Sequence, residues 1–314
     1  MVEYILLFML FYTWHAMGIT IGYHRLLSHR SFSCSKPVEY FWVLAGFLAF
    51  EGSPIWWATI HRAHHKYVET PLDPHSPRAL GIQYAFTGWL AEKEYAPHLD
   101  PYKQCKDLVA DPIYRFLDFD GRLPLGHAMG FACCFAFRLL LWAVFGWQVA
   151  LCSLLAGASV LSIPLMLNVV CHMPKLGYKN YALSDDSVNV WWVGLLAMGE
   201  GWHNNHHAAP GSAKSGMLAH EFDATWLMLR FMKSIGLIQR MNVADHNVLL
   251  ARTAAQLAKQ NDMTPVAVQE APALVTVGGG KNSGRVRDFG AKRAAVRKRR
   301  ELLTKRLTKQ ATNS

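Results

Sequence analysis

Long apolar stretches limit the possible folds of this 314-residue chain more than any other feature. Residues 4–22 carry no Asp, Glu, Lys or Arg, and residues 129–147 and 149–170 contain Arg138 as their single charge. Each stretch is about as long as the ~20 residues that a helix needs to cross a membrane. A hydrophobic content of 52% agrees with this interpretation. The sequence therefore predicts an all-α integral membrane protein with three or four transmembrane helices.

A fourth apolar stretch, residues 38–60, leaves its path open. It contains Glu51, Gly52 and Pro54, so it can span the membrane, re-enter it or lie as a buried helix at its surface. A span near 38–58 would give four transmembrane helices instead of three. The start MVEY lacks the basic region of a cleaved signal peptide, so we expect the first span to remain as an anchor.

Two polar segments, 61–126 and 172–262, separate or follow the apolar stretches and are rich in His, Asp and Lys. Arg25, Arg30 and Lys36 come near the end of the first span, and positive residues favour the cytoplasmic side of a membrane. We therefore expect both polar segments to form a cytosolic helical cap, with the N-terminus on the opposite side.

The C-terminal part differs in composition from the membrane domain, which we place at residues 1–262. Residues 263–284 have the composition of a flexible linker, and the basic tail 285–314 holds eleven Lys and Arg residues against Asp288 and Glu301. A solvated helix or a disordered tail explains such a segment, and attraction to anionic membrane lipids is the alternative. Nucleic acid is not an expected partner, because no nucleic-acid-binding motif accompanies the charge.

The six cysteines form no CxxC pair with metal-ligand spacing, and most lie in or beside apolar stretches. We expect them to be free thiols that pack as small hydrophobic residues in a reducing compartment.

Nine of the fifteen histidines fall into four groups, HRLLSH, HRAHH, NVVCH and HNNHH, and this grouping predicts metal ligands. The candidate ligands are His24, His29, His61, His64, His65, His172, His203, His206 and His207. Positions i, i+3 and i+4 share a helix face, so we expect each HxxHH group to aim three imidazoles at one point. His24 and His29 converge only if the helix ends or bends between them. The remaining histidines are interpreted as structural: His15, His75, His98, His127, His220 and His246.

Nine imidazoles exceed the coordination number of one ion, so the sequence predicts two metal ions with four or five nitrogen ligands each. Neutral imidazole suits Zn, Cu, Ni and Fe, and the sequence offers no thiolate site. The chain lacks the HExxH motif of zinc proteases and the paired Glu-x-x-His motifs of soluble di-iron bundles. A histidine-rich pair of irons at a membrane face is the remaining interpretation.

These motifs resemble those of the membrane fatty acid desaturases, in particular the Δ9 acyl-CoA or acyl-lipid type. The resemblance rests on GITIGYHRLLSHRSF (18–32), HRAHHKYVETPLDPHSP (61–77), NVVCH (168–172) and GEGWHNNHHAAPGSAKSG (199–216). It implies that all nine grouped histidines bind two irons and that Asn168 holds a water near the second iron. It also implies a bent tunnel for the acyl chain below the irons, with Trp57 in its wall.

The expected reaction is the O2-dependent insertion of a cis double bond, at position Δ9, into a saturated chain carried as acyl-CoA or acyl-lipid. Removing hydrogen from two unactivated methylene groups requires dioxygen, two electrons and a metal oxidant, because no acid or base side chain breaks such bonds. Electrons are expected from a separate ferredoxin, flavoprotein or cytochrome. Two alternatives remain: a hydroxylase on the same di-iron scaffold, and a histidine-rich membrane protein that transports or stores metal.

Several polar residues near the histidine groups are candidates for supporting roles. Glu200, Asn204 and Asn205 are candidates for orienting the imidazoles, whereas the pair Asp185 and Asp186 is interpreted as turn or cap residues. Arg62 and Lys66 flank the HRAHH group and either meet an anionic head group or increase surface solubility. Alanine is expected to abolish activity at His61, His65, His203 or His207, and to leave it intact at His98 or His246.

Overall fold

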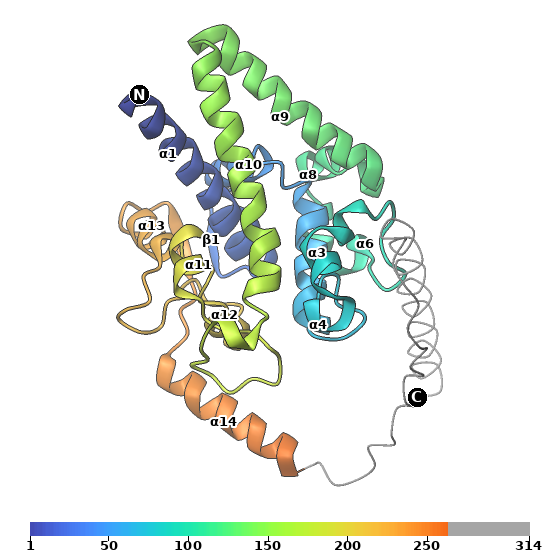
Figure 1. The fold of residues 1–314 in the computed structure, drawn as a ribbon, viewed down its shortest axis with the longest axis vertical. Helices are drawn as coiled ribbons and strands as arrows, with labels where there is room; N and C mark the ends of the chain where they lie inside the picture. Colours follow the sequence, from blue (N-terminus) through green and yellow to red (C-terminus); the bar gives the residue numbers. More distant parts are fainter. Residues whose placement is uncertain (263–314) are drawn as a thin grey trace, which may run out of the picture.

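Three long helices form the part of the molecule that can cross a membrane. The computed structural model describes residues 1–262 (Figure 1). Within them, α1 (Val2–Met17) continues directly into the π-helix η1 (Gly18–Ser28), and α9 (Leu123–Phe145) and α10 (Trp147–Val170) form a hairpin. The continuous α1–η1 helix, α9 and α10 are each long and apolar enough to span a bilayer. They confirm the predicted all-α class and agree with three of the predicted spans.

The spanning helices place both polar segments at the same end of the molecule. The start of α1 lies beside the start of α10, where the Sγ of Cys152 is 3.5 Å from the carbonyl oxygen of Tyr4. In Figure 1 the N-terminus and the α9–α10 turn lie toward the top, and the shorter helices gather at the opposite end. These shorter helices form the cap.

The apolar stretch near 38–58 does not form one spanning helix. It is divided into α2 (Lys36–Phe47) and α3 (Pro54–Tyr67), and neither is long enough to cross a bilayer. Phe50 and Gly52 in the connection adopt left-handed φ angles of 67° and 76°, and the proline at the start of α3 favours a new helix. Within residues 1–262, three helices instead of four are therefore long and apolar enough to span a bilayer.

Glycines allow α2 and η1 to approach closely. A Cβ atom added to Gly18 would overlap the backbone nitrogen of Gly46, and one added to Gly46 would lie 3.1 Å from the carbonyl of Gly18. The two backbones are thus in direct contact. This contact holds α2 along the helix that carries the first histidine group.

The substitution Gly18→Ala is therefore expected to destabilise the protein by about 1–3 kcal/mol, the usual cost of overpacking a filled interface. The matched control is Gly211→Ala, because no atom lies within 4 Å of a Cβ added there. Thermal unfolding in detergent measures both variants. Equal unfolding midpoints for the two would contradict the close α2–η1 contact.

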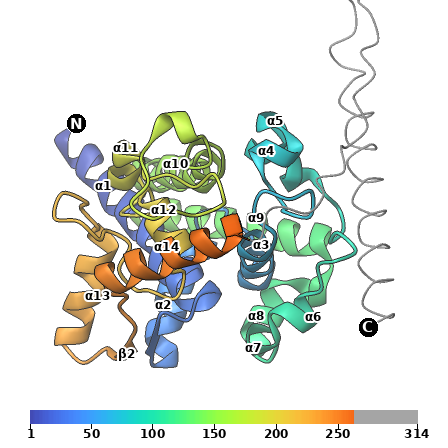
Figure 2. The same ribbon diagram turned by 90° about the horizontal axis from the view of Figure 1, so that it is seen from below.

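The cap consists of two halves that lie on opposite sides of α10 when seen from below (Figure 2). The first half follows α3 and contains α4 (Pro77–Leu80), α5 (Ile82–Phe86), η2 (Gly88–Ala91), α6 (Pro101–Gln104), α7 (Lys106–Val109), α8 (Pro112–Leu117) and η3 (Phe119–Gly121). The second half follows α10 and contains η4 (Pro174–Leu176), α11 (Trp191–Leu196), α12 (His203–Ala208), α13 (Ala224–Ser234), β2 (Ile238–Met241) and α14 (His246–Asp262).

A short antiparallel pair of strands ties the end of η1 to the second half of the cap. β1 (Phe32–Cys34) pairs with β2, with Phe32 opposite Met241 and Cys34 opposite Ile238. Phe32 and Ile238 are both buried in the main hydrophobic core. The first histidine group is thereby fixed to the part of the cap that also carries α12.

The single charge inside the spanning hairpin has polar neighbours. Arg138 is 5% exposed, and its guanidinium donates to the carbonyl oxygens of Cys134 and Ser153 and contacts the Nε2 of His15. The Nδ1 of His15 lies 2.7 Å from the carbonyl oxygen of Ala45. Buried charges in membrane segments require such partners, so His15 has the structural role expected from the sequence.

All six cysteines are free, and four of them are buried. This agrees with the predicted role as small hydrophobic residues. The predicted linker at 263–284 and the basic tail at 285–314 lie outside the described residues.

Candidate metal centre

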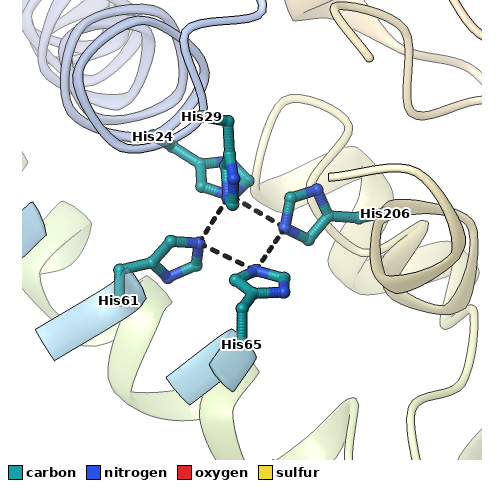
Figure 3. Close-up of side chains that lie close together, drawn as sticks. All are labelled: His24, His29, His61, His65 and His206. Atoms are coloured by element: carbon teal, nitrogen blue, oxygen red, sulfur yellow. Dashed lines mark hydrogen bonds between the residues drawn. The ribbon is translucent and has the colours of Figure 1, made fainter. Parts of the chain in front are cut away.

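Nine imidazoles from four separate segments converge into two clusters between the halves of the cap. The first cluster contains His24, His29, His61, His65 and His206 (Figure 3). The second cluster contains His64, His172, His203 and His207. Within each cluster, one ring nitrogen of every histidine lies within 4.8 Å of the same atom type in all the others. The first cluster thus brings together five imidazoles and the second cluster four.

The HxxHH groups divide their histidines between the clusters, so the expectation that each group serves one point is wrong. In HRAHH, His61 and His65 join the first cluster and His64 joins the second. In HNNHH the division is reversed, because His206 joins the first cluster and the other two histidines join the second. The i+3 and i+4 side chains lie about 100° apart around a helix, so their imidazoles diverge. Helices α3 and α12 therefore each contribute to both clusters.

The π-helix η1 explains how His24 and His29 meet. A π-helix joins residues five apart by hydrogen bonds, and the backbone N–H of His29 donates to the carbonyl of His24 at 3.2 Å. The helix then ends at Ser28, so the two rings approach to a centroid distance of 4.8 Å. Both the changed winding and the helix end contribute to this convergence, as the HxxxxH spacing requires.

Carboxylates lie beside the outer ring nitrogen of four histidines. The Nδ1–carboxylate distances are 2.7 Å for His24–Glu200, 3.0 Å for His64–Asp73, 2.8 Å for His172–Glu69 and 3.3 Å for His207–Asp185. Burial acts to raise the pKa of Asp73, but the neighbouring His64 lowers it below its usual value. An ionised carboxylate accepts the Nδ1–H and leaves Nε2 as a free lone pair.

The free lone pairs face one another, and this arrangement fits bound cations. His203 Nε2 lies 3.0 Å from that of His172 and 3.1 Å from that of His207. Since both partners have their proton on Nδ1, a proton on His203 Nε2 can be donated to one of their lone pairs at a time, whereas a cation between the three nitrogens attracts all of them. Two ligands at right angles, each ~2.1 Å from a metal ion, have their nitrogens about 3 Å apart. The spacing is therefore that of adjacent ligands on one ion.

Burial keeps the inward-facing imidazoles neutral. It lowers the pKa of His61, His65, His203 and His206 well below the ordinary value, and the neighbouring histidines lower it further. Neutral imidazole is the form that binds a metal ion. The clusters thus have the composition, the charge state and the spacing of a metal-binding centre.

The polar residues selected from the sequence differ in what they contact. The Oε2 of Glu200 lies 2.7 Å from His24 Nδ1, so orienting His24 stays its predicted role. Asn204 and Asn205 instead position α12: Asn204 Oδ1 accepts the backbone N–H of Tyr181, and Asn205 Nδ2 donates to Glu221 Oε2. These two side chains therefore act on the helix that carries three ligands, not on the imidazoles themselves.

Asp185 has a larger role than the sequence suggested. It accepts hydrogen bonds from Ser187, as a turn residue does, but its Oδ2 also lies 3.3 Å from His207 Nδ1. Among the described residues, its neighbour Asp186 forms an ion pair with Arg78 at 3.5 Å. Glu69 and Asp73 are not among the supporting residues predicted from the sequence, although both lie in the VETPLDPH segment that follows the HRAHH group. The sequence signal for both residues is a carboxylate a few positions after a histidine group.

Adjacent aspartates offer a matched test of this role. The substitution Asp185→Asn is expected to weaken metal binding by about 10- to 100-fold, because a ligand loses the acceptor that fixes its orientation. Asp186→Asn is the control, and its affinity should equal that of the parent protein. Competition with a chelator measures both. Equal affinities for the two variants would show that Asp185 does not orient His207.

The predicted substrate residues lie in three different environments. All the N–H groups of Arg62 are committed to protein partners, among them the carbonyls of Leu27 and Gln104 and the carboxylate of Asp107. The structure therefore corrects the head-group role considered for Arg62. Lys66 is exposed. Trp57 is buried and stacks on His61, with ring centroids 5.0 Å apart.

Two apolar cavities meet at Trp57 and His61, and both reach Asn168. The first, here called the α1 cavity, lies between the α1–η1 helix and α10 and is lined by Ala16, Ile19, Thr20, Val160 and Ile163 among others. The second, here called the α9 cavity, has a volume of about 260 Å³ and is lined by Glu51, Trp56, Trp89, His127 and Phe131 among others. The two cavities, together called the passage below, thus adjoin beside the first cluster.

His75, for which the sequence predicts a structural role, lies beside the second cluster. Its ring stacks on that of His64 with a centroid distance of 4.5 Å, and it also lines the α9 cavity. His64, Asp73 and His75 form a further group of possible ligands, but Asp73 is already the acceptor for His64 Nδ1. His75 therefore belongs to the wall between the cavity and the cluster.

Comparison with known proteins relates this chain to one family. Residues 3–247 match the family described as fatty acid desaturase. A probable chloroplastic lipid desaturase of Arabidopsis thaliana is 40% identical over 224 residues, which are 70% of this chain and 58% of that protein. The chain thus spans less than two thirds of this relative. An sn-1 stearoyl-lipid 9-desaturase of Anabaena variabilis is 37% identical over 240 residues, or 76% of this chain and 83% of the relative.

Another relative differs in the stated acyl carrier and position. An acyl-CoA C20 Delta5-desaturase of Anemone leveillei is 35% identical over 230 residues, which are 72% of this chain and 69% of that protein. The names of these relatives share one type of reaction but not one substrate.

Proposed function

Because the chain belongs to the fatty acid desaturase family and is therefore an oxidoreductase that desaturates fatty acyl chains, we propose that it places a cis double bond at Δ9 with two irons and O2. A lipid-bound acyl chain is the proposed substrate, since most of the similar relatives are named as lipid desaturases. Acyl-CoA remains the alternative carrier. Metal transport or storage finds no support in the family.

The observation that carries the proposal is the pair of histidine clusters at the wall of an apolar passage. Iron bound there would supply, with dioxygen, the oxidising power that no side chain provides. The nine histidines would hold the ions, and Glu69, Asp73, Asp185 and Glu200 would orient four of them. The passage would exclude water and present one pair of acyl carbons to the irons. The position of the double bond then depends on how the passage holds the acyl chain.

In this proposal the acyl chain passes Trp57, with its methyl end in the α1 cavity. The walls of that cavity come from the membrane-crossing α1–η1 helix and α10, and apolar walls suit a hydrocarbon tail. Asn168 faces both cavities near His61, where we propose that it holds a water beside the metal centre. Lys66 is exposed and free to meet a charged head group.

The cap is proposed to face the cytoplasm. Arg30 and Lys36 are exposed just beyond η1, at the cap end of the first spanning helix. Positive residues at this place favour the cytoplasmic side. A separate ferredoxin, flavoprotein or cytochrome would supply the electrons there.

Metal analysis of the purified protein tests the proposed cofactor. Two iron ions per chain are expected, with loss of product formation after chelation and recovery when ferrous iron is added. Recovery with zinc, or full activity of the metal-free protein, would contradict the proposal.

A further inference from the structure

The α9 cavity contains buried polar atoms that have no hydrogen-bond partner among the described residues. They are the Oε1 of Glu51, the Nε1 of Trp89 and the Nδ1 of His75. The side chains of Glu51 and His75 are 5% and 3% exposed, and His75 Nδ1 is still 4.0 Å from the nearest carboxylate, Asp73. An unsatisfied buried polar group destabilises the folded protein, so several around one cavity require an explanation.

The backbone places Glu51 in this position with some strain. Phe50 and Gly52 on either side of it have left-handed φ angles, which are unfavourable for phenylalanine. The Oε2 of Glu51 accepts a hydrogen bond from Trp57 Nε1 at 3.2 Å. Glu51 also lines the cavity, and its Oε1 has no partner among the described residues. Burial raises the pKa of Glu51 to about 8, so at neutral pH the carboxyl group carries a proton and can donate it in a hydrogen bond.

Trp89 lines the same cavity, and its indole N–H has no partner among the described residues. Its ring stacks on Trp56, with centroids 5.4 Å apart and an angle of 11° between the ring planes, and it also contacts His75. These contacts fix the orientation of the indole. The cavity wall thus combines hydrophobic surface with at least two positioned donors, which is the usual composition of a site for a ligand with one polar group.

We propose that Glu51 and Trp89 bind the carbonyl oxygen of the acyl group, at the point where the chain is joined to its carrier. The inference rests on the proposed desaturase function and adds the site that sets the position of the double bond. A Δ9 position is counted from the carboxyl end, so an enzyme that selects it must hold that end at a fixed distance from the metal centre.

The location of the cavity supports this assignment. His127 and Phe131 come from the first turns of α9, and Leu161, Leu165 and Asn168 come from the last turns of α10. Both segments lie at the cap end of the spanning helices, where the ester groups of membrane lipids lie. Two ring contacts, of 5.3 and 4.5 Å, lead from Trp89 through His75 to His64. These contacts limit the distance between the rings of Trp89 and His64 to about 10 Å at most, and eight extended carbon–carbon bonds span about the same length.

Two substitutions test the donors separately. Trp89→Phe removes the N–H and keeps a ring, so the ratio of the main double-bond isomer to its neighbours should fall by about 3- to 10-fold, the effect of one hydrogen bond. Glu51→Leu should have a similar effect, and Glu51→Gln should be more selective than Glu51→Leu because an amide can still donate. Trp142→Phe is the control, since Trp142 is exposed on α9.

An ether analogue tests the proposal without changing the protein. Membranes with the parent enzyme receive a stearoyl glycerolipid, stearoyl-CoA, or a glycerolipid in which an ether-linked octadecyl chain replaces the acyl group. Whichever acyl substrate the enzyme desaturates, glycerolipid or CoA ester, should give one main double-bond isomer. The ether should give a mixture of double-bond isomers. Trp89→Phe should give similar mixtures with ester and ether.

An unchanged double-bond position in Trp89→Phe and in Glu51→Leu, or a single isomer from the ether with the parent enzyme, would overturn the inference and leave water as the occupant of the cavity. These results would not affect the proposed function. Only the absence of any unsaturated product from both acyl substrates with the parent enzyme would contradict the function itself.

Discussion

The substitution His206→Ala is expected to abolish desaturation and to lower the iron content of the protein. His206 Nε2 lies 3.1 Å from that of His24 and 2.8 Å from that of His65, so it joins η1 and α3 in the first cluster. Loss of an outer partner of a metal ligand already costs about 10- to 100-fold in affinity or activity, and loss of the ligand itself should cost more. Product formation and bound iron are measured on the same membrane preparation.

His220→Ala is the appropriate control for this experiment. His220 is exposed, contacts Tyr178 at 3.2 Å and belongs to neither cluster. This variant should retain the activity and iron content of the parent. If His206→Ala also retains full activity, then the HNNHH group does not bind the catalytic metal, and the account of the first cluster fails.

The substitution Arg25→Met is expected to destabilise the protein by about 3–5 kcal/mol, because it removes one partner of a buried ionic network. Arg25 is 1% exposed and bonds to Glu200, to both carboxylate oxygens of Asp223 and to the carbonyl of Ala213. Without it, two carboxylates remain buried. Since Glu200 also orients His24, iron binding should weaken together with the fall in the thermal unfolding midpoint.

Arg30→Met is the matched control, since Arg30 is also an arginine in an ion pair but its side chain is 61% exposed. Its partner Asp107 keeps Arg62, so the effect on stability should stay below about 1 kcal/mol. An equally small effect of Arg25→Met would show that the Glu200–Arg25–Asp223 network does not support the metal centre.

Much of the architecture follows from the sequence because membrane crossing and metal binding both leave strong local patterns. Apolar length was sufficient to predict the three spanning helices. Repeated short spacing of histidines identified all nine members of the two clusters. In both cases the physical requirement acts on neighbouring residues, so it is visible without knowledge of the tertiary structure.

The division of the histidines between clusters could not be predicted in the same way. Whether His64 shares a site with His61 depends on where α12 lies relative to α3, and tertiary packing decides this. The π-helical winding of η1 could not be predicted from local sequence either, because it accompanies the close contact between Gly18 and Gly46. The hydrogen bonds from Arg62 on α3 to the carbonyls of Leu27 and Ser28 on η1 also depend on the contact between these two helices.

The fatty-acid profile of a host that produces this chain, with a suitable electron donor, tests the central claim most directly. Gas chromatography with derivatives that locate double bonds should detect a new cis-monounsaturated acid with its double bond at position 9, absent from a host that produces His206→Ala. A hydroxy acid in its place would assign the hydroxylase alternative. The account would be contradicted if the protein holds two irons and receives electrons but the host makes no new acid.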